Sequence, residues 1–409
     1  MTPSMRDRSA PAALVAALVL YAAVCAAMPS VWKGHAKISD VPVYQRYGDA
    51  VARGSVPYRD FRLEYPPGAL AVFVVPSLLT NGKVGYARAF GLEMAVLGAA
   101  GVVLAFLALG SLGATGAGFM AAIALSAAAP LLLGPLVLTR FDFLPAALVA
   151  ACLAALLAGR DRLGAAALGA AVAVKLYPAV LVPVLIASIW RRRDRRDALL
   201  ALGVCLGVVA VVFLPFVVIA PDGVGWSLWR QLGRPLQIES LGSAGLLALH
   251  HAAGLEIHWK SSNGSQNLTG TPATIASVLT GAAQAVALLW IWIRFARLRE
   301  PRPVELVAAS AAALTAFVAL GKVLSPQFLV WLFVPVALCR GRRGSIAVAA
   351  LVLACLLTRA WFPYRYWDLV FHFDPLASWL VVARDLTLVG LLGLLLSELR
   401  PARGRARST

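Results

Sequence analysis

Residues 160–196 read RDRLGAAALGAAVAVKLYPAVLVPVLIASIWRRRDRR. The stretch Lys175-Leu-Tyr-Pro178 interrupts the apolar residues 163–190 and divides them into two segments, 163–174 and 177–190, and both outer ends of the stretch are basic. Basic residues that flank membrane-spanning segments stay on the cytoplasmic side. Because both flanks are basic, we predict two short helices that meet near the outer surface. At about 1.5 Å per residue, neither helix crosses a bilayer unless the outer side is a water-filled cavity.

The composition of the whole chain is that of a polytopic membrane protein. Of its 409 residues, 60% are hydrophobic and only 14% are charged, which a soluble globular domain does not tolerate. Repeated apolar runs of about 20 residues predict membrane-spanning helices, since only helices satisfy their own backbone in lipid. The formal charge of +18 is concentrated in short linkers and the tail, a positive-inside pattern rather than a nucleic-acid-binding surface. We therefore predict an all-α polytopic membrane protein without a nucleic-acid partner.

The direction of each span follows when residues 191–196 are placed in the cytoplasm. Apolar runs on either side then alternate in direction, and the other basic linkers also fall on the cytoplasmic side. The expected spans are, in chain order, 11–28, 84–110, 114–135, 142–158, 197–220, 273–296, 303–320, 324–340, 344–361 and 376–398. With the two short helices they make a bundle of about 12 crossings, with both termini in the cytoplasm.

This arrangement predicts a single integral domain of the cell membrane over residues 1–409. Two large segments lie outside the membrane on the outer face, 33–83 and 221–272, and residues 400–409 form a basic cytoplasmic tail. No soluble domain is expected.

Residues 66–79 decide between two threadings. They are apolar but too few to span a bilayer, so we predict a helix that lies at the interface. In the alternative, 66–80 crosses and 163–190 is one tilted span, which moves Arg140 and Asp142 to the cytoplasm. That threading also leaves basic residues near position 160 outside, against the charge pattern.

Charged residues in or against the spans gather on one side in the preferred threading. They are Glu93, Arg140, Asp142, Lys175, Lys322, Arg359, Arg384 and Asp385, all in the outer half. Charge in hydrocarbon is costly, so a one-sided cluster indicates a polar reaction chamber or pathway at the outer face.

The first outer loop contributes the acidic and aromatic residues of the candidate site. Asp40 directly follows the first helix, and Tyr44 comes one turn later, so both can share a helix face. Asp40 is either a general base that takes a proton from a hydroxyl group or a cap for the next helix. Asp60 and Glu64 also lie one turn apart and could share a cation, but the arginines beside them favour a structural ion-pair network.

Three further positions supply cations to the outer face. Lys175 stands in a run of Ala, Val and Leu, so it needs a partner or an anionic ligand, and the start of the second short helix favours phosphate. Arg140 either binds an anion or pairs with Asp142, and Arg384 either binds an anion or neutralises its neighbour Asp385. A tight connection, GKVLSPQ at 321–327, adds one more cation and an amide, Lys322 and Gln327.

Several kinds of chemistry find no support in the sequence. There is no phosphate-binding loop, no dinucleotide fingerprint and no serine nucleophile motif, and the histidines show no metal-ligand spacing. We expect no metal and no cofactor. A phosphate bound by the cationic outer face is therefore expected to come from the lipid phase.

The chain resembles a known enzyme family through four motifs in a fixed order. They are Asp40-x-x-x-Tyr44, GSVPYRDFRLEYPPG at 54–68, Lys175-Leu-Tyr177-Pro178 and Ser325-Pro-Gln327. This set is similar to the GT-C polyprenyl-phosphate-dependent glycosyltransferases, and more specifically to glycosyltransferase family 87. The resemblance covers roughly residues 35–385.

The resemblance implies a function and a set of site residues. One sugar, with mannose as the first candidate, is transferred from a polyprenyl-phosphate donor to a hydroxyl of a glycolipid or polysaccharide acceptor. Membrane lipids are the other expected partners. Asp40 takes the role of the base. The cations expected to hold the donor phosphate are Lys175, Lys322, Arg384 and Arg140. The other residues expected to contact substrate are Tyr44, Asp60, Glu64, Tyr65, Asp142, Tyr177 and Gln327.

Two other functions remain open from the residues alone. A lipid or sugar transporter would explain a break between half-helices near Lys175, because transporters bind substrates at discontinuous helices. Against it, no inverted repeat is visible and the charges lie on one side. A non-catalytic membrane protein would tolerate substitution of Asp40 and Lys322.

Overall fold

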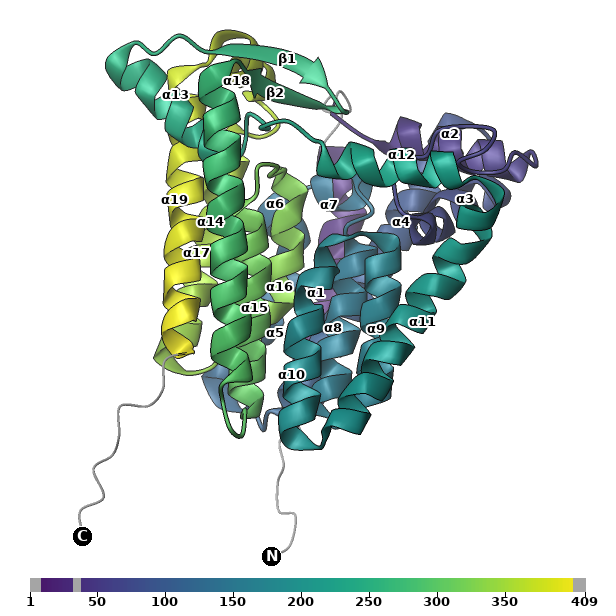
Figure 1. Ribbon diagram of the computed structural model, residues 1–409, viewed down its shortest axis with the longest axis vertical. Coiled ribbons are helices and arrows are strands. Elements are labelled where there is room, and N and C mark those ends of the chain that lie inside the picture. Colours follow the sequence, from purple (N-terminus) through teal and green to yellow (C-terminus); the bar gives the residue numbers. More distant parts are fainter. Residues whose placement is uncertain (1–8, 32–37, 400–409) are drawn as a thin grey trace, which may run out of the picture.

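The computed structural model describes residues 9–31 and 38–399 as a bundle of helices with a layer of short elements at one end (Figure 1). The predicted basic tail, 400–409, and the first residues of the first outer loop lie outside the described residues.

Seven helices in the described part of the chain are long and apolar enough to cross a membrane. They are α1 (Ser9–Val31), α4 (Gly82–Ser111), α11 (Arg195–Ile219), α14 (Thr271–Ala296), α15 (Pro303–Leu320), α17 (Gly341–Trp361) and α19 (Pro375–Glu398). Each corresponds to a span predicted from the sequence, so the helical membrane fold is confirmed. The total of about 12 crossings stays a prediction.

The remaining predicted spans consist of shorter pieces. Residues 114–135, expected as one helix, form α5 (Gly116–Ala127) and α6 (Ala129–Leu133), and α7 (Leu136–Thr139) follows. The chain turns at Gly134, whose φ of +66° suits glycine, and Pro135 lacks the N–H that a continuous helix needs. The other short pieces are α8 (Phe143–Leu157), the 3₁₀ segment η3 (Pro326–Leu332) and α16 (Phe333–Ala337).

The predicted pair of short helices is present. Helix α9 (Asp161–Val174) ends where Lys175 takes an extended conformation, and the 3₁₀ turn η2 (Tyr177–Leu181) leads into α10 (Val182–Arg192). At the far ends of the pair, Arg192 and Arg193 both donate to the Asp161 carboxylate, at 2.8 and 2.7 Å. The alternative of one continuous span over 163–190 is therefore wrong.

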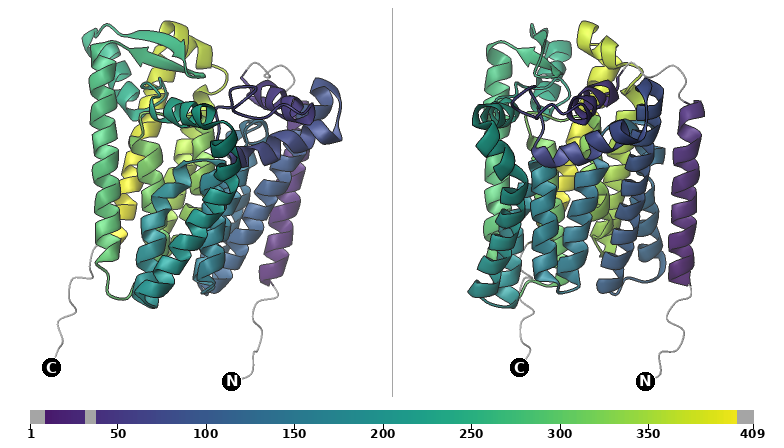
Figure 2. Two further views of the ribbon diagram at one scale, coloured as in Figure 1. Left: turned by 45° about the vertical axis from the view of Figure 1, so that its right-hand side comes forward. Right: turned by 90° about the vertical axis from the view of Figure 1, so that its right-hand side faces the viewer.

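Short elements cover one end of the bundle. They are α2 (Val41–Ala52), η1 (Pro67–Ala69), α3 (Leu70–Leu79), α12 (Pro221–Leu232), α13 (Leu241–Ala253), β1 (His258–Ser262), β2 (Ser265–Thr269) and α18 (Tyr366–His372). The start of α1 and the end of α19 both lie at the opposite end of the bundle (Figures 1 and 2). The segment predicted as an interfacial helix, 66–79, forms η1 and α3, and α3 packs against α2.

The antiparallel hairpin β1–β2 is a departure from the predicted all-α fold. Its turn is Asn263-Gly264, and both residues have positive φ, +52° and +71°. Asn-Gly is the preferred pair for such a tight turn, because its backbone twist matches that of the flanking strands. The hairpin lies within the predicted second outer segment.

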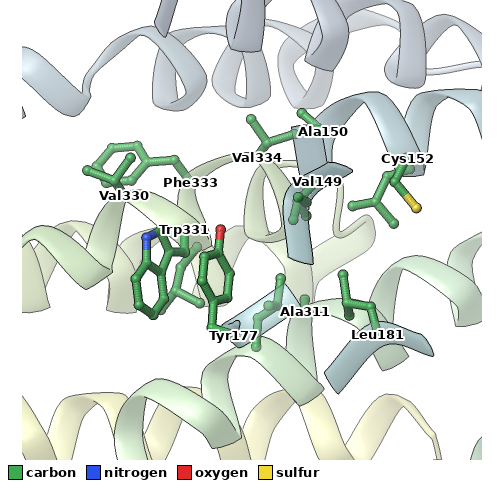
Figure 3. Packing of buried hydrophobic residues seen from close by; sticks show 14 of the residues in the cluster. Val149, Ala150, Cys152, Tyr177, Leu181, Ala311, Val330, Trp331, Phe333 and Val334 are labelled. Atoms are coloured by element: carbon green, nitrogen blue, oxygen red, sulfur yellow. The ribbon is translucent and has the colours of Figure 1, made fainter. Parts of the chain in front are cut away.

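Helix α15 forms the centre of the bundle, and α11 forms an edge. The most apolar stretch of α15 is 72% buried, whereas that of α11 is 6% buried. The many alanines of α15 let neighbouring helices approach closely. Figure 3 shows Ala311 of α15 among side chains of α8, η2, η3 and α16, with the Trp331 indole beside the Tyr177 ring. This packing fixes the inner wall of the site described next.

Candidate active site

A cavity of about 510 Å³ lies below the short elements that cover the bundle. Ten of the twelve predicted site residues line it, namely Asp40, Tyr44, Glu64, Tyr65, Arg140, Asp142, Lys175, Tyr177, Lys322 and Gln327. They come from the first outer loop, the α7–α8 corner, the break between α9 and η2, and the connection from α15 to η3. The size is typical of a small-molecule site.

Asp40 lies on the cavity wall immediately before α2. Its side chain makes no capping hydrogen bond to the helix, so the interpretation as a cap is wrong. Instead, Asp40 Oδ2 accepts a hydrogen bond from the Tyr44 hydroxyl at 3.3 Å and forms an ion pair with the Arg140 guanidinium. The Asp40 side chain keeps 36% of its surface exposed, so a substrate can reach it.

Tyr44 positions Asp40 from within an aromatic cluster. Its ring is 1% exposed and stacks on Phe73, with the ring centroids 4.5 Å apart. Phe141 and Tyr65 meet the same ring edge-on. The predicted shared helix face of Asp40 and Tyr44 is confirmed.

Of the two roles considered for Arg140, the pairing with Asp142 is not present, since each of the two residues has another partner. Arg140 has an extended backbone after α7 and reaches the first outer loop at Asp40. Burial lowers the pKa of Arg140 to about 10, so the guanidinium stays charged at neutral pH. Asp142 begins α8 and faces Lys175, whose Nζ lies 2.6 Å from Asp142 Oδ1.

Lys175 is enclosed by an acid and by aromatic faces. The Asp142 oxygen that it contacts also accepts the Trp331 indole N–H at 2.7 Å. Lys175 Nζ lies 4.6 Å from the Phe141 ring centroid and 5.0 Å from that of Trp331, distances at which cation–π attraction operates. Trp331 stacks on Tyr177, with centroids 3.7 Å apart (Figure 3). The lysine therefore has the anionic partner that its burial requires.

Lys322 ties the α15–η3 connection to the end of α12. Its Nζ donates to the Leu232 carbonyl at 2.9 Å. In the described part of the chain, Lys322 forms no ion pair, so no acid in that part neutralises its charge.

Asp60 and Arg384, the other two predicted residues, do not line the cavity. Asp60 is exposed and pairs with Arg59 at 2.8 Å, and this hydrogen-bonded contact lowers the pKa of Asp60 to about 2. Arg384 is fully buried in α19, pairs with the adjacent Asp385 and donates to the Glu239 carbonyl. Of the two roles predicted for Arg384, the structure displays the pairing with Asp385.

One wall of the cavity, formed by residues 230–239, was not predicted from the sequence. Arg230 forms an ion pair with Glu64 at 2.8 Å, and Gln231 donates to the Glu64 carbonyl at 2.6 Å. Glu64 is thus held by the second outer segment and not by a cation shared with Asp60. The polar run between α12 and α13 was the signal, but which loop it would meet cannot be read from spacing.

The same wall continues through Arg234, Gln237 and Glu239. Among the described residues, Arg234 has no carboxylate within ion-pair distance. Glu239 is 2% exposed, and burial raises its pKa to about 7, although the nearby arginines at 384 and 140 oppose that rise. In the part of the chain that the structure describes, the cavity is therefore lined by five basic and four acidic side chains, and Arg234 and Lys322 are the basic residues not paired to an acid.

Comparison with known proteins identifies the family. No curated protein matches the chain. The model of glycosyltransferase family 87 matches residues 63–326, which is more than half of the chain and contains Glu64, Arg140, Asp142, Lys175 and Lys322. Because the match covers most of the bundle and most of the cavity wall, the chain belongs to glycosyltransferase family 87.

Proposed function

We propose that this glycosyltransferase moves one sugar, with mannose as the first candidate, from a polyprenyl-phosphate donor to a hydroxyl group of a glycolipid or glycan. The observation that carries the proposal is the position of Asp40, an accessible carboxylate on the wall of a cavity that also contains two basic residues with no acidic partner among the described residues. Membership of a glycosyltransferase family favours covalent sugar transfer over the transporter alternative.

Asp40 is the general base of the proposed reaction. It takes the proton from the acceptor hydroxyl as the oxygen attacks the anomeric carbon, and the bond from that carbon to the phosphate oxygen breaks. The product is a new glycosidic bond with inverted configuration, and polyprenyl phosphate leaves. The ion pair with Arg140 favours the ionised form of Asp40 that can accept a proton.

Lys322 and Arg234 are the strongest candidates for binding the donor phosphate. Negative charge builds up on the leaving phosphate, and preorganised cations at that position stabilise the transition state. Arg140 and Lys175 are already paired with Asp40 and Asp142, so their charges contribute less. Arg384 acts at most through the Glu239 loop that it supports.

The arrangement of basic linkers supports an extracytoplasmic site. The ends of α10, α14 and α19 and the starts of α11, α15 and α17 lie at the end of the bundle opposite the short elements (Figure 1), whose residues line the cavity. These ends carry the arginine-rich linkers, which stay in the cytoplasm under the positive-inside pattern.

The variant Asp40→Asn tests the proposal. In membranes supplied with radiolabelled polyprenyl-phosphate mannose, we expect transfer to fall at least about a hundredfold, the usual contribution of a general base. The matched control is Glu256→Gln, because Glu256 is an outer carboxylate that is 85% exposed and lies outside the cavity. Full activity of Asp40→Asn at equal protein level would contradict the role of the base.

A further inference from the structure

Gln237 and Glu239 present two hydrogen-bond acceptors on one wall of the cavity. Both residues line it, and both are almost completely buried, at 3% and 2% exposure. In each side chain, one oxygen, Oε1, has no hydrogen-bond partner among the described residues. A buried acceptor without a donor is costly, so these oxygens require donors from a ligand or from water.

The hydrogen bonds that the Gln237 side-chain nitrogen donates fix the orientation of its amide group. Its Nε2 donates to Glu239 Oε2 and to Ser325 Oγ, the second at 2.8 Å. Because both partners accept from nitrogen, the amide oxygen is the atom left over. The same contact occupies Glu239 Oε2 and leaves Glu239 Oε1.

The backbone of this wall is held from several directions. The Gln237 carbonyl accepts from the hydroxyls of Ser240 and Ser243, each at 2.7 Å, and its N–H donates to the Lys322 carbonyl at 2.9 Å. Arg384 of α19 donates to the Glu239 carbonyl. Rigid support of this kind is what a recognition site needs, since it avoids ordering the residues at the moment of binding.

The two acceptors lie on the same cavity as the base. Glu239 is close enough for its charge to act on Arg140, which pairs with Asp40. The turn of the β1–β2 hairpin also lines the cavity. The main chain of β2 forms hydrogen bonds with the residues on both sides of Gln237. The Ile238 N–H donates to the Gln266 carbonyl at 3.0 Å, and the Leu268 N–H donates to the Leu236 carbonyl at 2.9 Å.

We infer that Gln237 and Glu239 form a subsite for neighbouring hydroxyl groups of a sugar ring. The ionised Glu239 carboxylate and the Gln237 amide oxygen accept hydrogen bonds and donate none, so they select a ligand rich in O–H groups and poor in negative charge. The ring is either the one being transferred or the one that accepts it. This inference rests on the proposed function, because it names the chemistry of a substrate of that same cavity.

The variant Glu239→Gln tests the subsite with little change of shape. Gln237 continues to hold one oxygen, so the new amide nitrogen replaces the free acceptor with a donor. The probes are farnesyl phosphate mannose, octyl mannoside and sugar-free farnesyl phosphate, each measured by binding to the purified protein in nanodiscs. We expect affinity for at least one mannose-bearing probe to fall about tenfold or more, with affinity for farnesyl phosphate unchanged. The matched control is Glu93→Gln, an acid of α4 that does not line the cavity.

A second measurement uses the unmodified protein. In a set of mannose probes that each lack one hydroxyl group, one probe lacks the hydroxyl that Glu239 binds. That probe should bind the wild type as weakly as the full probe binds Glu239→Gln. The variant itself should not respond to loss of that hydroxyl, because the interaction is already absent.

The outcomes separate the subsite from the proposed reaction. Loss confined to the donor probe assigns the subsite to the transferred sugar, and loss confined to octyl mannoside assigns it to the acceptor. Equal loss for sugar-free farnesyl phosphate, no loss at all, or no binding of either mannose probe to the wild type overturns the subsite. Binding of the probes without any transferred product overturns the transferase and leaves the subsite standing.

Discussion

Pairs of opposite charge dominate the cavity, and each pair joins segments that are distant in the sequence. Asp40 meets Arg140, Asp142 meets Lys175, and Glu64 meets Arg230. Ionised groups away from water need partners, which is why these contacts form. The pairing leaves the cavity close to neutral, so a bound phosphate is attracted by the few basic residues that remain.

Lys175→Met should destabilise the protein, because among the described residues it leaves the buried Asp142 carboxylate with only the Trp331 indole as a side-chain donor. Removing one partner of a buried pair costs about 3–5 kcal/mol. Thermal unfolding in detergent measures the effect. Adding Asp142→Asn should recover part of the loss, and a double variant no more stable than the single one would argue against the pair.

Glu239 should give the protein a pH-dependent stability. Its pKa is about 7 in the folded chain against an ordinary value of 4.5. The unfolded chain therefore loses this proton first, and the contribution of Glu239 to stability falls as pH rises from about 4.5 to about 7. The groups that act on it are Arg384 and Arg140, which favour the charged form, and Asp385, which opposes it.

Comparison with Glu239→Gln isolates that contribution. The amide does not titrate, so wild-type stability relative to the variant should decline by an amount on the order of 3 kcal/mol across this pH window. If the free energies of unfolding of the two proteins change in parallel from pH 4.5 to pH 7, burial does not hold the proton on Glu239.

The identity of single site residues was predictable from the cost of burying charge. Asp40, Lys175 and Lys322 stand out because each lies at the edge of, or within, an apolar run. Their partners were not predictable, since Arg140 was expected to meet Asp142 and instead meets Asp40. Sequence spacing gives neighbours on one helix, but it does not say which loop ends meet across a bundle.

The short helices are tied to the first outer loop by close packing at a glycine. A Cβ at Gly68 would lie 2.6 Å from the Ala173 carbonyl oxygen, near the end of α9. Only a residue without a side chain lets η1 approach the break that positions Lys175. This contact gives a physical reason for the glycine that closes the Glu-Tyr-Pro-Pro-Gly motif.

Gly68→Ala should push the first loop away from α9, destabilise the protein by about 1–3 kcal/mol and lower transfer activity. Gly225→Ala in α12 is the matched control, because no atom lies within 4 Å of a Cβ placed there. Unfolding temperature and transfer rate are the two measurements. Equal behaviour of the two variants would mean that the approach of η1 to α9 can relax without consequence.

Among the elements, the long spans and the pair α9–α10 follow from apolar length and basic flanks. Residues 114–135 and 324–340 do not form single helices, because the first breaks at Ala128, just before Pro130, and a 3₁₀ turn begins the second. The β hairpin went unpredicted although Asn263-Gly264 is a strong turn signal. Its strands are short and polar, and they are stabilised partly by bonds to residues 236–238, which are visible only in three dimensions.

The bundle as a whole separates a basic end from a cavity-bearing end, and this polarity can be tested by labelling. Among the described cysteines, four are buried and Cys339 is half-buried, so they should react slowly with maleimides. Glu256→Cys in the outer segment should react with a membrane-impermeant maleimide in intact cells. Glu300→Cys, in the linker between α14 and α15, should react only after permeabilisation. The reverse pattern would place the active site in the cytoplasm and overturn the proposed donor face.

The short length of α9 and α10 has a consequence for how the hydrophobic donor and the polar acceptor meet. With 14 and 11 residues, these helices rise only about 21 and 17 Å. Because neither helix is long enough to cross a bilayer, we infer that the proposed reaction centre at the ends of the pair lies below the level of the lipid headgroups. The prenyl tail of the proposed donor can then remain among the acyl chains of the lipids throughout turnover. The acceptor hydroxyl must reach below the headgroups to receive the sugar.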